Sequence, residues 1–224
     1  MCLNNKVDIA IIGGGIAGLW TLARLCKAGY QAVLLEAESL GCKQSGASQG
    51  IIHGGTKYAL TGKLTHSAQS IKQMPQRWQA CLDGVGEVDL SQAKKLSEHQ
   101  YLWSDKSLAA QLTGFFASKV MTSRMQHLAV KDYIAPFNQS AFKGELYQLD
   151  EPVLDTQSVL ETLREQFAQS IFQFPVEQIS QHNSLYQIQS ADKVMQAQIV
   201  ILTAGEGNEK LLRSLNFRQP KDRK

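Results

Sequence analysis

The residues with the clearest chemical meaning form the glycine-rich segment Gly13-Gly14-Gly15-Ile16-Ala17-Gly18. It matches the pattern G-x-G-x-x-G, directly after an apolar run and directly before a helix-like run. In this pattern the first glycine permits a tight turn, the second lets the backbone approach a pyrophosphate, and the third lets the helix pack closely on a strand. The amino terminus of that helix attracts the phosphates. The segment predicts a dinucleotide site that includes Gly13, Gly15, Ile16, Ala17 and Gly18.

An acidic residue stands where such a site holds a ribose. Glu36 ends the next apolar run, 23 positions after Gly13. A carboxylate there accepts hydrogen bonds from a ribose diol and disfavours a 2′-phosphate. Because NAD and FAD present the same ADP half to this unit, these residues leave the choice between the two cofactors open.

The elements that must position these residues are a strand, a helix and a second strand. Val7–Ile12 is short, apolar and rich in β-branched residues, as in a buried parallel strand. Ile16–Ala28 predicts a helix that stops at Gly29, and Gln31–Glu36 predicts the second strand. The apolar face of the helix comprises Leu19, Leu22, Ala23 and Cys26. The order predicts a βαβ unit.

Two further segments favour FAD over NAD: the loop Ser45–Gly55, rich in glycine and serine, and Thr203-Ala204-Gly205. In both, the chain resembles the family of FAD-dependent oxidoreductases that includes D-amino-acid oxidase, glycine and sarcosine oxidases, glycerol-3-phosphate dehydrogenase and L-2-hydroxyglutarate dehydrogenase. Gln49–Tyr58 is most similar to the segment that the last two branches place against the flavin. The resemblance covers almost the whole chain, weakly in the middle, and implies FAD as cofactor.

The resemblance also implies further cofactor contacts. Small or polar residues of the loop would contact the pyrophosphate and the ribityl chain: Ser45, Ser48, Gln49 and Gly50. Ala204 and Gly205 would end a strand beneath the cofactor. Val176 matches the position whose main chain meets the adenine, although an ordinary strand residue is an equal interpretation.

His53 is the candidate catalytic residue. An imidazole, with an unperturbed pKa of about 6.5, can accept a proton near neutral pH. In the family the flavin accepts a hydride from a C–H bond beside a hydroxyl or amine while a base accepts the proton. His53 could be that base, a flavin contact or a covalent attachment point, and the alternative is a loop histidine held by a backbone carbonyl.

Composition excludes several classes of function. The 224 residues carry a formal charge of only +3 without a basic cluster outside the last four residues, so no nucleic-acid partner is predicted. No histidine has a partner at metal-ligand spacing, so no metal site is predicted. No apolar stretch reaches the roughly 18 residues of a membrane span, which leaves only surface contact with a membrane open.

The four cysteines are Cys2, Cys26, Cys42 and Cys81. They form neither a C-x-x-C pair nor a disulfide-like framework, which predicts free thiols and a cytoplasmic protein.

The fold class predicted for the chain is α/β, a Rossmann-like FAD-binding domain with an inserted α+β substrate-side domain. The expected division is 1–84 and 151–215 for the FAD-binding domain, 85–150 for the substrate side and 216–224 for a polar tail. Beyond the βαβ unit, helices are predicted at Leu64–Leu82, Ser107–Leu112 and Pro152–Gln169, and strands at Gln100–Trp103, Ile171–Phe174, Val176–Ile179, Leu185–Ile188, Lys193–Met195 and Gln198–Thr203.

The predicted function is transfer of a hydride from a small hydroxy acid, polyol phosphate or amino acid to FAD. Members of the family continue well beyond the last predicted strand, so the sequence is expected to be an amino-terminal portion. The alternative is a truncated, non-catalytic nucleotide-binding fragment or interaction module. A pyridine-nucleotide dehydrogenase is a third interpretation, but it leaves Ser45–Gly55 unexplained. The oligomeric state is not indicated.

Overall fold

The chain forms two units. The computed structural model describes residues 6–54, 71, 73–104, 125–191 and 193–215. Unit 1 comprises Met1–Ser48, Glu87–Ala93 and Thr156–Lys224, and unit 2 comprises Gln49–Gly86 and Lys94–Asp155. The chain therefore first leaves unit 1 after Ser48, earlier than the predicted boundary at residue 84. Just after this point the backbone already pairs within unit 2, since Ile52 N–H donates to the Pro152 carbonyl (2.9 Å).

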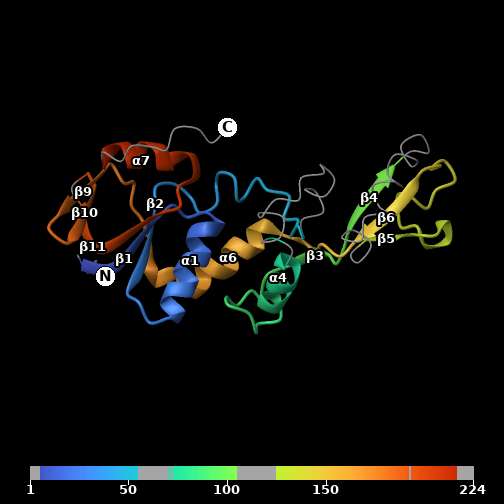
Figure 1. The fold of residues 1–224 in the computed structure, drawn as a ribbon, viewed down its shortest axis with the longest axis horizontal. Helices are drawn as coiled ribbons and strands as arrows, with labels where there is room; N and C mark the ends of the chain where they lie inside the picture. The colour runs from blue at the N-terminus through green and yellow to red at the C-terminus, as the bar shows by residue number, and fades with distance from the viewer. Residues whose placement is uncertain (1–5, 55–70, 72, 105–124, 192, 216–224) are drawn as a thin grey trace. The chain divides into compact units, whose positions relative to one another are not determined.

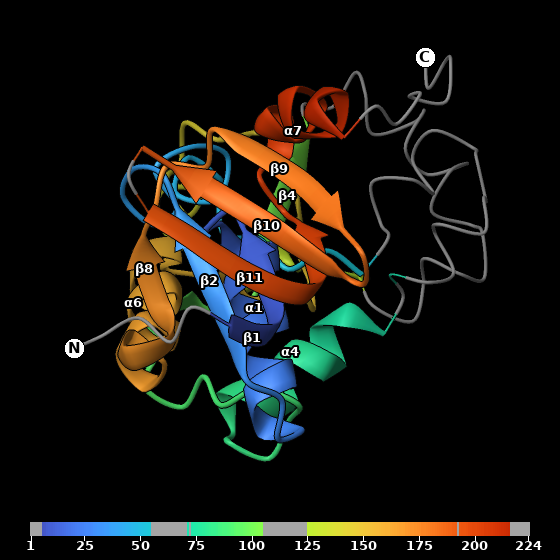
Figure 2. The same cartoon turned by 90° about the vertical axis from the view of Figure 1, so that its left-hand side faces the viewer.

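A six-stranded sheet forms the centre of unit 1 (Figures 1 and 2). Its order is β8 (Ile171–Gln173), β2 (Ala32–Glu36), β1 (Lys6–Ile12), β11 (Lys193–Leu202), β10 (Leu185–Ser190) and β9 (Gln178–His182). The first four strands are parallel, and β10 and β9 continue the sheet as antiparallel strands. The predicted βαβ unit and the mixed α/β class are confirmed.

The helices of unit 1 are α1 (Ile16–Lys27), α6 (Thr156–Gln166) and α7 (Asn208–Ser214), with 3₁₀ turns at Ala168–Ser170 and Gly205–Gly207. Helices α1 and α6 lie side by side, and α7 lies along β9 (Figures 1 and 2). Apolar side chains of the sheet and of α1 and α6 are completely buried: Ile11, Leu19, Leu22, Leu34 and Leu163. Burying a leucine stabilises a fold by about 1.5 to 3 kcal/mol, so these positions anchor the helices on the sheet.

Two predictions about elements were wrong. The helix predicted from Pro152 begins only at Thr156, because Val153–Leu154 forms a short strand, β7, in unit 2. Lys193–Met195 and Gln198–Thr203 are not separate strands, because β11 runs unbroken from Lys193 to Leu202. It pairs antiparallel with β10 at its start and parallel with β1 along most of its length.

The described residues of unit 2 form two small antiparallel sheets and helix α4 (Met74–Leu82). Strand β3 (Lys95–Ser97) pairs with β7, and the other sheet has the order β4 (Gln100–Ser104), β6 (Glu145–Leu149), β5 (Met125–His127). A 3₁₀ turn covers Val130–Asp132. Helix α4 has Pro75 in its first turn, where a missing N–H costs no hydrogen bond. The helix predicted at Ser107–Leu112 and most of Leu64–Met74 lie outside the described residues.

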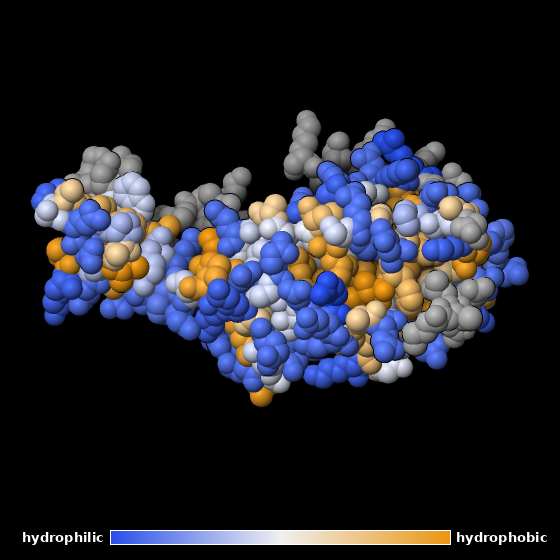
Figure 3. Space-filling model, turned by 180° about the vertical axis from the view of Figure 1, so that it is seen from behind, coloured by the Kyte–Doolittle hydropathy of each residue, from blue (hydrophilic) through white to orange (hydrophobic). Residues whose placement is uncertain are grey.

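One face of the structure is mostly polar. On the face shown in Figure 3, hydrophilic residues predominate and hydrophobic residues gather in patches between them. The exposed apolar side chains include Trp103, which is 61% exposed on β4 beside the rings of Phe137 and Phe142. Among the described residues, no helix is both long and apolar enough to span a bilayer.

Candidate cofactor-binding site

The predicted site residues of unit 1 meet at one edge of the six-stranded sheet. Gly13 follows β1, Glu36 ends β2 and Thr203 follows β11. Because these strands are parallel, their carboxyl ends lie together. The chain passes from β1 to β2 on one side while β11 lies on the other side, so this edge is a topological switch point, where α/β sheets bind ligands.

A cavity of about 410 Å³ opens at this edge. Its volume falls in the range of small-molecule sites, about 300 to 1,000 Å³. Seven of the residues predicted to bind the cofactor line it: Gly13, Gly15, Glu36, Ser45, Val176, Ala204 and Gly205. The structure therefore brings together residues from the two ends of the chain that the sequence analysis selected separately.

The glycines at this edge permit contacts that no larger residue allows. Gly13 has a φ of +111°, and a Cβ on it would lie 2.6 Å from the Ala204 backbone. A Cβ on Gly18 would lie 2.0 Å from the Gly13 carbonyl oxygen. The Thr203 hydroxyl donates a hydrogen bond to that same oxygen (2.8 Å), so the turns that follow β11 and β1 are tied together. Gly18 acts in packing and does not line the cavity.

Glu36 places its carboxylate on the backbone of the glycine turn. Its Oε2 accepts a hydrogen bond from Gly14 N–H (2.5 Å), and its Oε1 accepts one from Glu38 N–H (2.8 Å). An ionised carboxylate has about four acceptor positions, so each oxygen can accept a further hydrogen bond. The contacts hold the carboxylate at the cavity wall.

Ser45 links the loop to the helix. Its hydroxyl accepts a hydrogen bond from Ile16 N–H (2.9 Å), one of the free amides at the start of α1. Ser48 donates to the Ser45 carbonyl (2.9 Å) and thereby holds the loop turn. Ile16, Ala17 and Ser48 themselves do not line the cavity.

Several residues of the cavity wall are not predicted from the sequence: Glu38, Cys42, Lys43, Phe174, Lys210 and Leu211. Lys43 and Glu38 form an exposed ion pair (3.1 Å), in which the hydrogen bond from Lys43 lowers the pKa of Glu38 and the same bond raises the pKa of Lys43. Phe174 is buried directly after β8 and Leu211 lies on α7. In the sequence, an apolar residue just after a strand or on a short helix cannot be distinguished from an ordinary core residue.

Gln49, Gly50 and His53 belong to unit 2. Gly50 has a φ of +71°, and its carbonyl accepts a hydrogen bond from Leu154 N–H (2.9 Å). His53 Nδ1 lies 3.2 Å from Oε2 of Glu151, a carboxylate whose side chain is only 1% exposed. The partner of His53 in the structure is therefore the buried side chain of Glu151 and not a backbone carbonyl. Glu151 is not among the residues predicted from the sequence.

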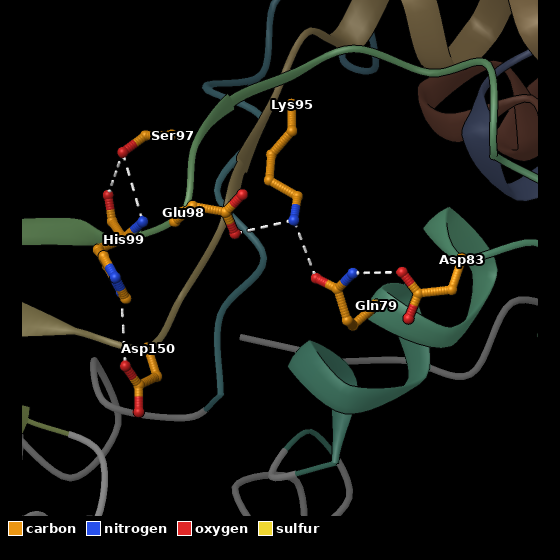
Figure 4. A network of polar contacts seen from close by, with 7 residues as sticks. All are labelled: Gln79, Asp83, Lys95, Ser97, Glu98, His99 and Asp150. Atoms are coloured by element: carbon orange, nitrogen blue, oxygen red, sulfur yellow. Dashed lines mark hydrogen bonds and ion pairs between the residues drawn. The ribbon is translucent and has the colours of Figure 1, made fainter.

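A second polar network of unit 2 surrounds His99 (Figure 4). The ring of His99 faces Asp150, with Nδ1 3.4 Å from Oδ1, and its backbone carbonyl accepts a hydrogen bond from Ser97. Lys95 donates to both Gln79 and Glu98. Within the described ranges, no three histidine, cysteine or acidic residues are arranged to hold a metal ion. We therefore interpret this network as a structural link between α4 and the strands.

Cys42 provides a direct probe of the cavity, because it is exposed and lines the wall. We expect iodoacetamide to modify Cys42 faster than Cys26, whose pKa is raised by burial. FAD at ten times its dissociation constant should slow modification of Cys42 about tenfold, since about one tenth of the sites stay empty. Peptide mass spectrometry measures both rates. The buried Cys81 serves as the unreactive control, and equal rates for Cys42 with and without FAD would contradict the prediction.

Comparison with known proteins gives consistent results. The family model of FAD dependent oxidoreductases (DAO) matches residues 8–223. A probable FAD-dependent oxidoreductase of Pseudomonas aeruginosa is 46% identical over 216 residues, which cover 96% of this chain and 55% of that protein. Aerobic glycerol-3-phosphate dehydrogenase of Escherichia coli is 43% identical over 51 residues, 23% of this chain and 10% of that protein.

Solved structures agree on the fold. The crystal structure of the Pseudomonas aeruginosa oxidoreductase superposes with a TM-score of 0.78 at 36% identity and covers 99% of this chain and 53% of its own. Glycine oxidase from Geobacillus kaustophilus superposes with a TM-score of 0.71 at 16% identity, over 96% of this chain and 60% of its own. The chain thus spans between half and two thirds of these proteins, and about half of the first.

Proposed function

Since this chain belongs to the family of FAD-dependent oxidoreductases, we propose that it forms the FAD-binding part of an enzyme that oxidises a small hydroxy acid, polyol phosphate or amino acid. The observation that carries the proposal is the cavity at the carboxyl ends of β1, β2 and β11. It combines a helix amino terminus, a fixed carboxylate and small residues in one place.

The residues present fit the ADP half of FAD. Glu36 would accept hydrogen bonds from the ribose hydroxyls, because both of its oxygens are fixed at the cavity wall. The amino terminus of α1, which has no acidic residue in its first turn, would face the pyrophosphate with its partial positive charge. Val176 and Phe174 would contact the adenine side, and Ser45, Ala204 and Gly205 would line the path towards the flavin.

His53 would accept a proton. When bound, FAD supplies the acceptor for the hydride that leaves the substrate carbon. The proton of the neighbouring hydroxyl or amine must go to a base, and a histidine suits that role near neutral pH. Gln49 and Gly50, four and three positions before His53, would approach the cofactor through their backbone, as the resemblance of this loop implies.

The test is cofactor binding followed by turnover. We expect FAD fluorescence to be quenched on titration with the purified protein, and NADH to bind far more weakly. Reduction of an artificial electron acceptor is then measured with a panel of 2-hydroxy acids, glycerol 3-phosphate and amino acids. Absence of FAD binding would refute the proposal for this chain. FAD binding with no turnover across the panel would favour the non-catalytic alternative instead.

A cytoplasmic location is part of the same proposal. Its support is the state of the three described cysteines, Cys26, Cys42 and Cys81, which are all free thiols. Free thiols persist where glutathione and thioredoxin keep them reduced.

A further inference from the structure

We propose that Glu151 is the positioning residue of His53 and holds its imidazole in the Nδ1–H tautomer, so that Nε2 is the atom that accepts the proton. The inference rests on the proposed function for its chemical meaning, but the tautomer itself can be measured without any cofactor or substrate. It arises from a contact between residues that lie 98 positions apart.

The carboxylate of Glu151 uses its two oxygens on two adjacent residues. Oε2 lies 3.2 Å from His53 Nδ1, and Oε1 accepts a hydrogen bond from Gly54 N–H at 2.7 Å. The Glu151 side chain is 1% exposed, whereas that of His53 is 40% exposed. A carboxylate is costly to bury unless it is hydrogen-bonded, so these contacts fix the group in place. The ring is thereby held on one edge and accessible on another.

The backbone holds the same two segments together. Ile52 N–H donates to the Pro152 carbonyl (2.9 Å), Leu154 N–H donates to the Gly50 carbonyl (2.9 Å), and Ile51 pairs with Val153 as an antiparallel bridge. These contacts join the residues that directly precede His53 to the residues that directly follow Glu151. The position of the carboxylate relative to the ring is therefore set by the strand pairing and not by the side chains alone.

The chemistry of the two groups determines the tautomer. A carboxylate accepts hydrogen bonds and donates none, so the nitrogen that faces it must carry the hydrogen. A neutral imidazole has one N–H and one lone pair, which leaves the lone pair on Nε2. When Nε2 takes the proton of a substrate hydroxyl or amine, the electron pair of that bond stays on the oxygen or nitrogen. It becomes the second bond to carbon as the hydride departs to FAD.

Glu151→Gln reverses the arrangement with almost no change in shape. Gly54 N–H still needs an acceptor, so the amide oxygen should face Gly54 and the NH₂ group should face His53. That NH₂ group donates to Nδ1, so the ring hydrogen moves to Nε2. Nε2 then has no free lone pair with which to accept a proton. In a protein that turns over, loss of the base should lower kcat by about 10²- to 10⁴-fold while FAD affinity stays unchanged.

The experiment is long-range ¹H–¹⁵N correlation spectroscopy of the full ¹⁵N-labelled chain at alkaline pH, with His53→Gln used to assign the ring signals. We expect Nδ1 to be protonated in the wild-type protein and Nε2 in Glu151→Gln. Asp150→Asn is the matched control, because the neighbouring carboxylate faces His99 and should leave the His53 tautomer unchanged. An Nε2–H tautomer in the wild-type protein, or an unchanged tautomer in Glu151→Gln, would overturn the proposal. Failure of FAD to bind would refute the proposed function alone and leave this readout intact.

Discussion

Replacing Gly18 with alanine should weaken FAD binding by about 10- to 100-fold. The added Cβ would lie 2.0 Å from the Gly13 carbonyl oxygen and 2.9 Å from the Thr203 hydroxyl oxygen. Backbone cannot move aside as a side chain can, so α1 must shift away from the ends of β1 and β11. Overpacking of this kind costs about 1 to 3 kcal/mol, and each 1.4 kcal/mol corresponds to a factor of ten in affinity. Urea denaturation measures the loss of stability of the fold, and FAD fluorescence titration measures the loss of affinity.

Gly207→Ala is the matched control for this prediction. Gly207, unlike Gly18, lines the cavity itself, but its added Cβ would approach only the Ala204 Cβ, at an ordinary contact distance of 3.4 Å. The control should therefore bind FAD nearly as well as the wild-type protein. If Gly18→Ala also bound FAD with wild-type affinity, the close junction between helix and strands would have no part in forming the site.

Replacing Glu36 with glutamine should lower FAD affinity by about 10-fold or more. A hydrogen bond to a charged group contributes about 1.5 to 3 kcal/mol, and the amide keeps only one oxygen for the Gly14 and Glu38 amides and the ribose hydroxyls. Fluorescence titration with FAD measures the change. Glu38→Gln is the control, because Glu38 lies two positions further along the same cavity wall but its side chain makes an exposed pair with Lys43, so little change is expected. Equal affinities for the two variants would contradict a role for Glu36 at the ribose.

Local sequence patterns predicted the part of the fold that local forces determine. The predicted segments have their own periodicity and glycine stops, and β1, α1 and β2 match them within one residue at each end: Val7–Ile12, Ile16–Ala28 and Gln31–Glu36. Val153–Leu154 was assigned to a helix because its neighbours have helical spacing. Its pairing with β3, a strand more than fifty positions earlier, decides its conformation, and no pattern within the segment reports that partner.

The same distinction applies to the site. Gly13, Gly15, Glu36 and Ser45 line one cavity, and the sequence singled them out by the glycine pattern, by the spacing of Glu36 from it and by the resemblance of the Ser45 loop. Glu151 could not be predicted, because a glutamate that precedes a proline carries no local signal of a partner 98 positions away. Nothing in the sequence marks Lys43 and Lys210 as residues of the cavity wall, since an isolated lysine is usually only solvated.

The long strand β11 has a consequence for the order in which the protein can fold. It is the parallel neighbour of β1, and this pairing joins Lys6 to Gln196, residues separated by 190 positions. During synthesis β1 and β2 emerge early, but one edge of β1 stays without its neighbour until β11 has left the ribosome. Contacts between such distant residues slow folding and expose unpaired edges meanwhile. Because Thr203 and Ala204 follow β11 directly, the cavity that they line is completed at a late step, and FAD bound there would stabilise only chains that have reached it.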